Sequence, residues 1–196
     1  MDIIQQKEIL IEVLSKENGK KAVYLLDKYK NQVFEFIPEL KEEDGFEQKN
    51  PWHIYDVWHH TLKALEKSRP DLDIRLALLL HDIGKPISYQ EEGNIRHFKG
   101  HSEKSAEISK DILERFKFEE KEINEIVYLI ENHSKTIEID KVNKDNIEIT
   151  KKLLYVQFCD ASAYNPEYIP ETMEKLNVIG QKLLDLQEKI KEDEQR

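Results

Sequence analysis

Glycine and proline are scarce in this sequence, with six of each among 196 residues. Together they reach only about half of the roughly 12% that these two residues contribute to an average protein. A fold of many short strands depends on such residues at its turns, so the shortage argues against an all-β sandwich or barrel. It favours long elements joined by few turns.

Cysteine and long apolar runs are also missing. Cys159 is the single cysteine and cannot form an internal disulfide, which fits a reducing, cytoplasmic location. The longest apolar runs, Leu76–Leu80 and Ile126–Ile130, have five residues each, far fewer than the ~20 that a membrane helix needs. The start, Met1–Gln6, has no basic flank typical of a signal peptide, and we expect no membrane partner.

Positive charge is in deficit. The chain has 30 basic and 40 acidic residues, for a formal net charge of −10. This sign excludes a broad surface that follows nucleic-acid phosphates, although it leaves a local basic pocket open. The apolar share of 39% suits one globular domain with a core and a small helical annex.

Apolar residues recur at helical spacing through almost the whole chain. Pro38 and the polar residues 41–50 are expected to close an N-terminal helical section, and a short hairpin is expected only within Ile87–Gly100. Gly84 and Pro86 are expected to stop the helix before them. The spacing predicts further helices at Trp52–Ser68, at Asp71–Asp82, from Ser102 onward, at Glu119–His133, at Asp145–Tyr164 and at Glu171–Glu194.

The last of these helices has a coiled-coil seam about two heptads long. Its apolar residues alternate in spacings of three and four: Leu176, Ile179, Leu183, Leu186 and Ile190. We favour packing of this seam within the chain, because short apolar stripes are usually part of the core. A homodimer through the same helix is the alternative.

The most informative stretch runs from His81 to Pro86, where an ionisable pair ends a helix that is otherwise apolar nearly all round. Such a helix belongs in the centre of the core, and a buried carboxylate there is costly unless a cation compensates it. Lys85 is the nearest cation in the sequence. A divalent metal would compensate Asp82 more fully, because histidine and carboxylate together are good metal ligands.

Other residues of ligand type continue apolar faces at helical spacing. They are His60, His101, His133 and Asp160. Each one alone is explained as a core residue with satisfied hydrogen bonds. Together with His81 and Asp82 they favour a metal site, because no run of buried basic residues accompanies these four histidines and two carboxylates.

The order of His60, His81-Asp82 and Asp160 resembles the signature of the HD superfamily of metal-dependent phosphohydrolases. The sequence is most similar to the HD-containing C-terminal half of bacterial tRNA nucleotidyltransferases, the CCA-adding enzymes and their poly(A) polymerase relatives. The similarity extends from about Ile9 to Asn165. Three segments carry it, namely Asn50–Leu62, the HDIGKP run at His81–Pro86, and Phe98–His101.

This resemblance implies an all-α HD-domain helical bundle. It divides the chain into an N-terminal helical annex at residues 1–50, the HD core at 51–168 and a long C-terminal helix at 169–196. It also implies a divalent metal cofactor, one or two ions of Mn, Fe, Ni, Mg or Zn. The expected ligands are His60, His81, Asp82 and Asp160 for one ion, with His101 and His133 completing a second site.

The expected reaction is hydrolysis of phosphate esters or diesters, of nucleotides or RNA ends, by metal-activated water. Asp82 and Lys85 are the expected catalytic residues, and Lys85, His101 and His97 are expected to contact a small phosphate ester or nucleotide substrate. Nucleotide addition is not expected, because the nucleotidyltransferase domain that precedes the HD region in those enzymes is missing from a sequence that begins at Met1. The competing interpretation is a non-enzymatic module whose metal is a structural clamp and which binds RNA or nucleotide or mediates dimerisation.

Overall fold

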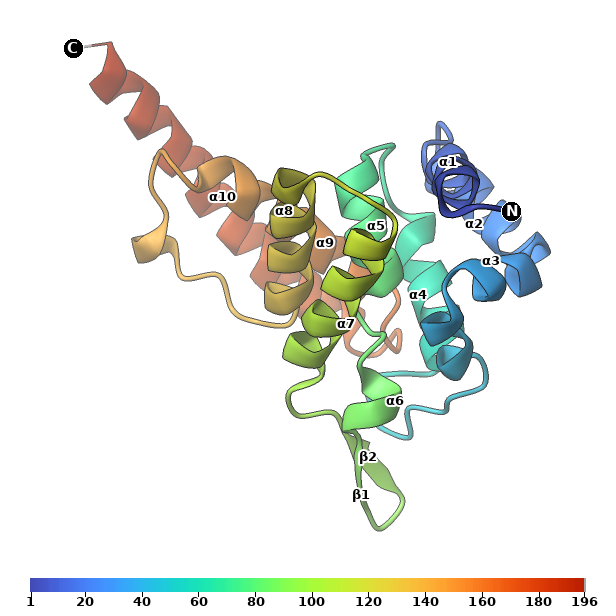
Figure 1. Ribbon diagram of the computed structural model, residues 1–196. Helices are drawn as coiled ribbons and strands as arrows, with labels where there is room; N and C mark the ends of the chain where they lie inside the picture. The colour runs from blue at the N-terminus through green and yellow to red at the C-terminus, as the bar shows by residue number, and fades with distance from the viewer. Residues whose placement is uncertain (196) are drawn as a thin grey trace.

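Helices make up most of the protein in a computed structural model that describes residues 1–195 (Figure 1). Two 3-10 helices, η1 (Pro38–Glu43) and η2 (Ile139–Lys141), accompany an antiparallel hairpin of β1 (Gln90–Glu92) and β2 (Ile95–His97). The all-α prediction and the place of the hairpin are therefore confirmed. The α-helices are α1 (Ile3–Leu14), α2 (Gly19–Lys28), α3 (Lys30–Phe36), α4 (Val57–Glu66), α5 (Leu72–Leu80), α6 (Lys85–Ser88), α7 (His101–Arg115), α8 (Glu120–Asn132), α9 (Ile147–Ala161) and α10 (Ile169–Glu194).

Helix α5 lies in the middle of the bundle and packs against α4, α8 and α9 (Figure 1). Every residue from Ile74 to Leu80 is buried, as expected for a helix that is apolar nearly all round. Each fully buried leucine contributes about 1.5–3 kcal/mol of transfer free energy. The burial of α5 therefore holds the residues that follow it, His81 and Asp82, inside the core.

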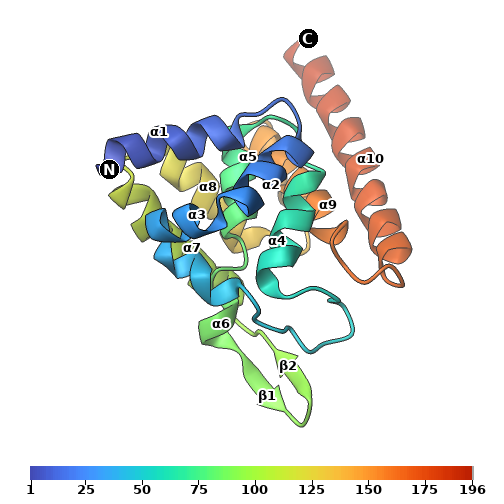
Figure 2. The same ribbon diagram turned by 90° about the vertical axis from the view of Figure 1, so that its right-hand side faces the viewer.

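Helices α1, α2 and α3 fall within the predicted N-terminal annex; α1 packs on α5, α2 packs on α4, and α3 packs on α2 and η1 (Figure 2). Arg75 of α5 connects the annex to the core. Its guanidinium is completely buried and donates hydrogen bonds to the carbonyl oxygens of Leu14, Lys16 and Ser68. Leu14 and Lys16 stand at the end of α1, where carbonyl groups have no partners within the helix.

Helix α10 packs along α9 and buries Leu176 and Leu183, while its C-terminal half extends beyond the bundle (Figure 1, Figure 2). Packing of the apolar seam within the chain is thus present, and a homodimer through α10 stays a prediction. The division at residues 50 and 168 also stays a prediction. Among the described residues, no helix has both the length and the apolar character that a membrane span requires.

Helix α4 is shorter than predicted. Its sequence spacing predicted a start at Trp52, but the helix begins at Val57. The side chain of Asp56 caps it by accepting a hydrogen bond of 2.7 Å from the backbone N–H of His59. Such an N-cap satisfies a donor that the first turn leaves without a partner, so the boundary follows from side-chain capping rather than from apolar periodicity.

The prolines act differently from the prediction. Helix α5 ends at Leu80, and Pro86 stands in the first turn of α6, where its missing N–H removes no helical hydrogen bond. Pro38 likewise begins η1. The polar residues 41–50, which were expected to close the N-terminal helical section, include two buried side chains, Glu43 and Gln48. This segment is therefore part of the folded core.

Candidate metal centre

Two side chains that are 100 residues apart in the sequence meet in the core, His60 from α4 and Asp160 from α9. His60 is completely buried and Asp160 is 5% exposed. The Nε2 atom of His60 lies 2.8 Å from Oδ1 of Asp160. Both side chains continue the buried faces of their helices, as their spacing predicted.

The end of α5 brings His81 and Asp82 to the same point. Nε2 of His81 lies 3.2 Å from Oδ2 of Asp82 and 3.5 Å from Oδ1 of Asp160. Nε2 of His60 lies 3.5 Å from Oδ2 of Asp82. One half of the cluster is therefore built around a single oxygen of Asp82, with donors from α4, α9 and the turn that follows α5.

His101 and His133 approach the other oxygen of Asp82. His101 is the first residue of α7, and His133 follows the last residue of α8. Their Nε2 atoms lie 3.4 and 3.7 Å from Oδ1 of Asp82, respectively. The structure thus brings all six predicted ligand residues together, and Asp82 stands between the two halves.

The close approach of α7 depends on Gly84 in the turn after α5. A Cβ atom at this position would lie 2.6 Å from the backbone nitrogen of Ser105 and 2.7 Å from the carbonyl oxygen of His101. The N–H of Gly84 donates a hydrogen bond of 2.9 Å to Oγ of Ser105. Any side chain here would push α7, and His101 with it, away from the cluster.

The four histidines present the same nitrogen to the cluster. Nδ1 of His81, His101 and His133 lies 2.7, 2.7 and 2.6 Å from the backbone carbonyl oxygen three residues earlier, and Nδ1 of His60 lies 3.4 Å from that of Ala163. A carbonyl accepts only from a protonated nitrogen, so in the neutral ring the lone pair is on Nε2. A hydrogen-bonded outer nitrogen is the usual support of a metal-binding imidazole.

Asp82 is the central carboxylate and is 1% exposed. Among the described residues, neither of its oxygens has a hydrogen-bond partner. The ammonium of Lys85 lies 2.7 Å from Oδ2, but its approach lacks hydrogen-bond geometry. Burial alone would raise the pKa of Asp82, and the charges of His81 and Lys85 outweigh this effect and hold the pKa well below its usual range.

The histidines respond to these carboxylates in different ways. Burial alone would lower the pKa of His81, but Asp82 and Asp160 outweigh it and raise the pKa to about 10. Burial, and next the charge of His81, lowers the pKa of His133 to about 3. Two buried carboxylates therefore draw positive charge into the cluster, and a divalent cation is a chemically suitable source of it.

The donor set fits a divalent metal. His60, His81 and Asp160 form one group of buried donors, and His81, Asp82 and His133 form another. Within each group the donor atoms all lie within 4.8 Å of one another. Imidazole nitrogens and carboxylate oxygens are both metal ligands, and the orphaned oxygens of Asp82 supply the required negative charge.

The two remaining predicted site residues lie outside this donor set. The ammonium of Lys85 donates a 2.7 Å hydrogen bond to Oε1 of Gln48, and the side chain is only 4% exposed. Lys85 thus neutralises Asp82 from inside the protein. The hairpin of β1 and β2 projects from the helices (Figure 2). His97 stands on β2, with 56% of its side chain exposed. Substrate contacts of either residue stay predictions.

Three residues near the centre were missed by the sequence reasoning. Tyr164 donates a 2.9 Å hydrogen bond from its hydroxyl to Oδ2 of Asp160. Glu43 is completely buried, and burial together with the charge of Asp82 raises its pKa well above the usual range. Gln48 holds Lys85. Tyr164 follows Asp160 by about one helical turn, which was a usable signal. Glu43 and Gln48 lie in a polar stretch where no periodicity marks them.

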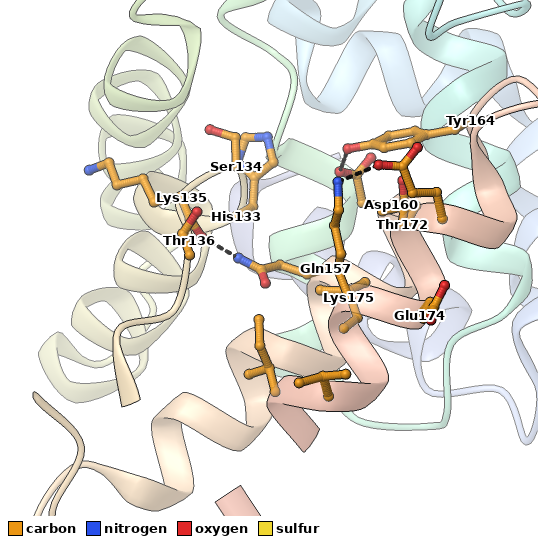
Figure 3. A pocket seen from close by; sticks show the side chains of 15 residues that line it. His133, Ser134, Lys135, Thr136, Gln157, Asp160, Tyr164, Thr172, Glu174 and Lys175 are labelled. Atoms are coloured by element: carbon orange, nitrogen blue, oxygen red, sulfur yellow. Dashed lines mark hydrogen bonds and ion pairs between the residues drawn. The ribbon is translucent and has the colours of Figure 1, made fainter. Parts of the chain in front are cut away.

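A pocket of about 630 Å³ adjoins the centre (Figure 3). The buried donors His133 and Asp160 line it, together with Tyr164 and residues of α10. Its volume falls within the ~300–1,000 Å³ of small-molecule sites. A small molecule in this pocket would therefore touch two of the side chains that are candidate metal ligands.

Comparison with known proteins agrees with this geometry. The HD domain family matches residues 53–165. The A-adding tRNA nucleotidyltransferase of Deinococcus radiodurans is 36% identical over 104 residues, which is 50% of this chain and 24% of that protein. The CC-adding tRNA nucleotidyltransferase of Thermus thermophilus is 30% identical over 105 residues, again 50% of this chain and 24% of that protein. The multifunctional CCA protein of Shewanella denitrificans is 33% identical over 85 residues, which is 41% of this chain and 20% of that protein. The similarity therefore spans about a quarter of each relative or less.

Proposed function

Because this chain belongs to the HD domain family, we propose that it hydrolyses phosphate esters or diesters of nucleotides or RNA ends with the help of one or two divalent metal ions. The observation that carries this proposal is the position of Asp82. Its two buried oxygens lack hydrogen-bond partners among the described residues and face separate histidine pairs, His60 with His81 and His101 with His133.

The residues that would hold the metal follow from these two halves. His60, His81, Asp160 and Oδ2 of Asp82 would hold one ion, while the remaining donors, Oδ1 of Asp82 with His101 and His133, would hold a second. A divalent ion acts as a Lewis acid on phosphoryl oxygens and lowers the pKa of coordinated water toward ~7. The excess of imidazole over carboxylate favours Fe, Ni or Zn over Mg.

Residues around these donors keep them in a reactive state. In the metal-free protein, the charges of His81 and Lys85 outweigh the effect of burial and hold the pKa of Asp82 well below its usual range, so this carboxylate is ionised when a cation arrives. The backbone carbonyls that accept from the histidine Nδ1 atoms orient each Nε2 toward the cluster. The Tyr164 hydroxyl orients Asp160 by donating to Oδ2, which leaves Oδ1 facing His60 and His81.

The alternative function is a non-enzymatic module in which the metal only clamps α4, α5 and α9 together. The pocket beside His133 and Asp160 favours the enzyme, because a structural metal site needs no access for a substrate whereas a catalytic site keeps an open position. The relatives are tRNA nucleotidyltransferases, and an RNA end is therefore retained among the candidate substrates.

The proposal is tested with the full chain purified without chelator. Metal content is measured by mass spectrometry, and hydrolysis is measured on phosphomonoesters and phosphodiesters with several divalent ions. His60→Ala is compared with His59→Ala, since His59 is adjacent on α4 but exposed and paired with Asp56. We expect loss of metal and hydrolysis only in His60→Ala. If the unsubstituted protein binds metal but hydrolyses none of these substrates, the non-enzymatic module with a structural metal becomes the better interpretation.

A further inference from the structure

One wall of the pocket beside the centre is formed by residues that lie outside the segment matching the HD domain family. That match ends at residue 165, and α10 begins at Ile169. Leu176, Val178 and Ile179 of α10 nevertheless line the pocket together with His133 and Asp160. The C-terminal helix therefore shapes the space next to the candidate metal ligands.

Helix α10 lines the pocket with three apolar side chains, Leu176, Val178 and Ile179, beside the polar and charged residues Glu171, Thr172, Glu174 and Lys175. The lysines of the pocket are already paired. Nζ of Lys175 lies 2.6 Å from Oε1 of Glu171. Nζ of Lys135 lies 3.3 Å from Oε1 of Glu131 and 3.5 Å from Oε1 of Glu103. A site that follows an RNA backbone needs cations that are free to neutralise successive phosphates. The pocket and the net charge of −10 do not provide this pattern.

Size and polarity together indicate a single small occupant. A pocket of about 630 Å³ accommodates one molecule of drug size rather than a single strand of RNA. Its apolar side chains favour contact with an uncharged surface, and the hydroxyl of Thr136 can bond a polar atom. The hydroxyls of Ser134 and Thr172 already bond Ser102 and the carbonyl of Tyr168, and each keeps a lone pair that can accept a further hydrogen bond. Both features match one nucleoside, whose base is flat and largely apolar and whose sugar bears hydroxyl groups.

We propose that α10 completes a subsite that binds the leaving group of the reaction. This subsite accepts one uncharged group of nucleoside size, so the substrate is a nucleoside monophosphate. This inference rests on the proposed function. Hydrolysis adds the oxygen of water to phosphorus and breaks the ester P–O bond. A proton from the water passes to the departing oxygen, which yields the nucleoside and inorganic phosphate. The phosphate lies at the candidate metal ligands, and the nucleoside lies between α9 and α10.

The test compares Val178→Trp with Leu184→Trp. Both residues are on α10 and have nearly equal exposure, 51% and 52%, but only Val178 lines this pocket. An indole at position 178 occupies part of the pocket, and one at position 184 lies outside it. The probes are a nucleoside, its 5′-monophosphate and inorganic phosphate. Their Kd values are measured by calorimetry or NMR titration on the metal-loaded full chain.

We expect Val178→Trp to raise the Kd of the nucleoside and of the monophosphate by about tenfold, or about 1.4 kcal/mol. Inorganic phosphate binding and metal content should match the parent, and Leu184→Trp should behave as the parent for every probe. Unchanged nucleoside and monophosphate binding in Val178→Trp would overturn the subsite. Preferential hydrolysis of a 3′-phosphorylated RNA oligonucleotide over mononucleotides would overturn it as well.

The subsite and the proposed function fail in different ways. If the unsubstituted protein binds the nucleoside, Val178→Trp weakens that binding, and no phosphate ester is hydrolysed, then the subsite is supported and the proposed hydrolase activity is refuted. A parent that hydrolyses phosphate esters but binds no nucleoside overturns the subsite and leaves the hydrolase standing. Because nucleoside binding needs neither phosphate nor turnover, this measurement does not depend on catalysis.

Discussion

The Nε2 atoms of His101 and His133 lie 3.3 Å apart, and the Nδ1 atom of each ring is hydrogen-bonded to a backbone carbonyl. In their neutral forms, the two rings turn lone pairs toward each other and toward Oδ1 of Asp82. Two of these three acceptors, Asp82 and His133, are buried and His101 is mostly covered, so their lone pairs repel one another unless a proton or a cation lies among them. This relationship is the geometric basis for expecting a second metal position.

His133→Ala should lower metal content from two ions per chain to one, because it removes a ligand from the half of the cluster that faces Oδ1 of Asp82. The half around His60 should stay filled. Mass spectrometry of the native protein measures the stoichiometry, and His59→Ala is the exposed control. If the parent and His133→Ala each bind one ion and the variant has lost activity, the two-metal scheme is rejected and His133 is a substrate contact instead.

Asp82→Asn and His81→Ala should each abolish metal binding and hydrolysis. Asparagine keeps the shape of the side chain and removes the charge that both halves of the cluster share. The metal-free form of Asp82→Asn should also be less stable than the metal-free parent by about 3 kcal/mol, because the change leaves the buried ammonium of Lys85 without its carboxylate partner. Full metal occupancy in both variants would disprove the assignment of these ligands.

Lys85→Met should destabilise the metal-free protein by about 3 kcal/mol, because it keeps the apolar stem and leaves Asp82 and Gln48 without their buried partner. The control is Lys63→Met, which breaks a half-exposed pair with Glu66 and should cost at most about 1 kcal/mol. Urea unfolding measures both. Parental stability combined with a roughly tenfold lower kcat/KM would instead assign Lys85 to the substrate phosphate.

Gly84→Ala should destabilise the fold and weaken metal binding at His101, because the added Cβ would overlap the backbone of Ser105 and the carbonyl oxygen of His101. Overpacking of this kind costs about 1–3 kcal/mol. Gly180→Ala on α10 is the matched control. Its nearest neighbour would be Leu154 at 3.5 Å, so it should be neutral or stabilising by up to about 1 kcal/mol. Equal stability of the two variants would show that α7 adjusts to the larger side chain.

Arg75→Met should weaken the packing of the predicted N-terminal annex against the core and lower the free energy of unfolding. The change leaves the buried carbonyl oxygen of Leu14 without a donor, at about 1–3 kcal/mol, and the partly buried carbonyl oxygen of Lys16 likewise, at a smaller cost. Arg69→Met, at an exposed position, should change the free energy of unfolding by less than about 0.5 kcal/mol. Hydrogen exchange in α1 should accelerate only in Arg75→Met. Parental exchange in that variant would mean that apolar contacts alone hold the annex.

Periodicity predicted the helices well but not all of their ends. The apolar spacing of α5 and α9 is a local property of the chain, and both helices lie where it placed them. The start of α4 was wrong by five residues, because Asp56 caps the helix through its side chain, which periodicity does not register. Glu43 and Gln48 were missed for a related reason, since their burial depends on α6 and the turn after α5, which are far away in the sequence.

The sequence by itself determined that each ligand-type residue stands on an apolar face that folding buries. That these residues meet at one centre was predicted by the resemblance to the HD superfamily, which the HDIGKP run and its order with His60 and Asp160 carry. Only the tertiary structure decided which oxygen of Asp82 faces which histidine pair, that Lys85 is buried against Gln48, and that α10 closes a pocket beside His133. These relationships depend on how α4, α7, α8, α9 and α10 approach one another. That approach is set by side-chain packing and by the space that Gly84 leaves, and no local pattern in the sequence encodes it.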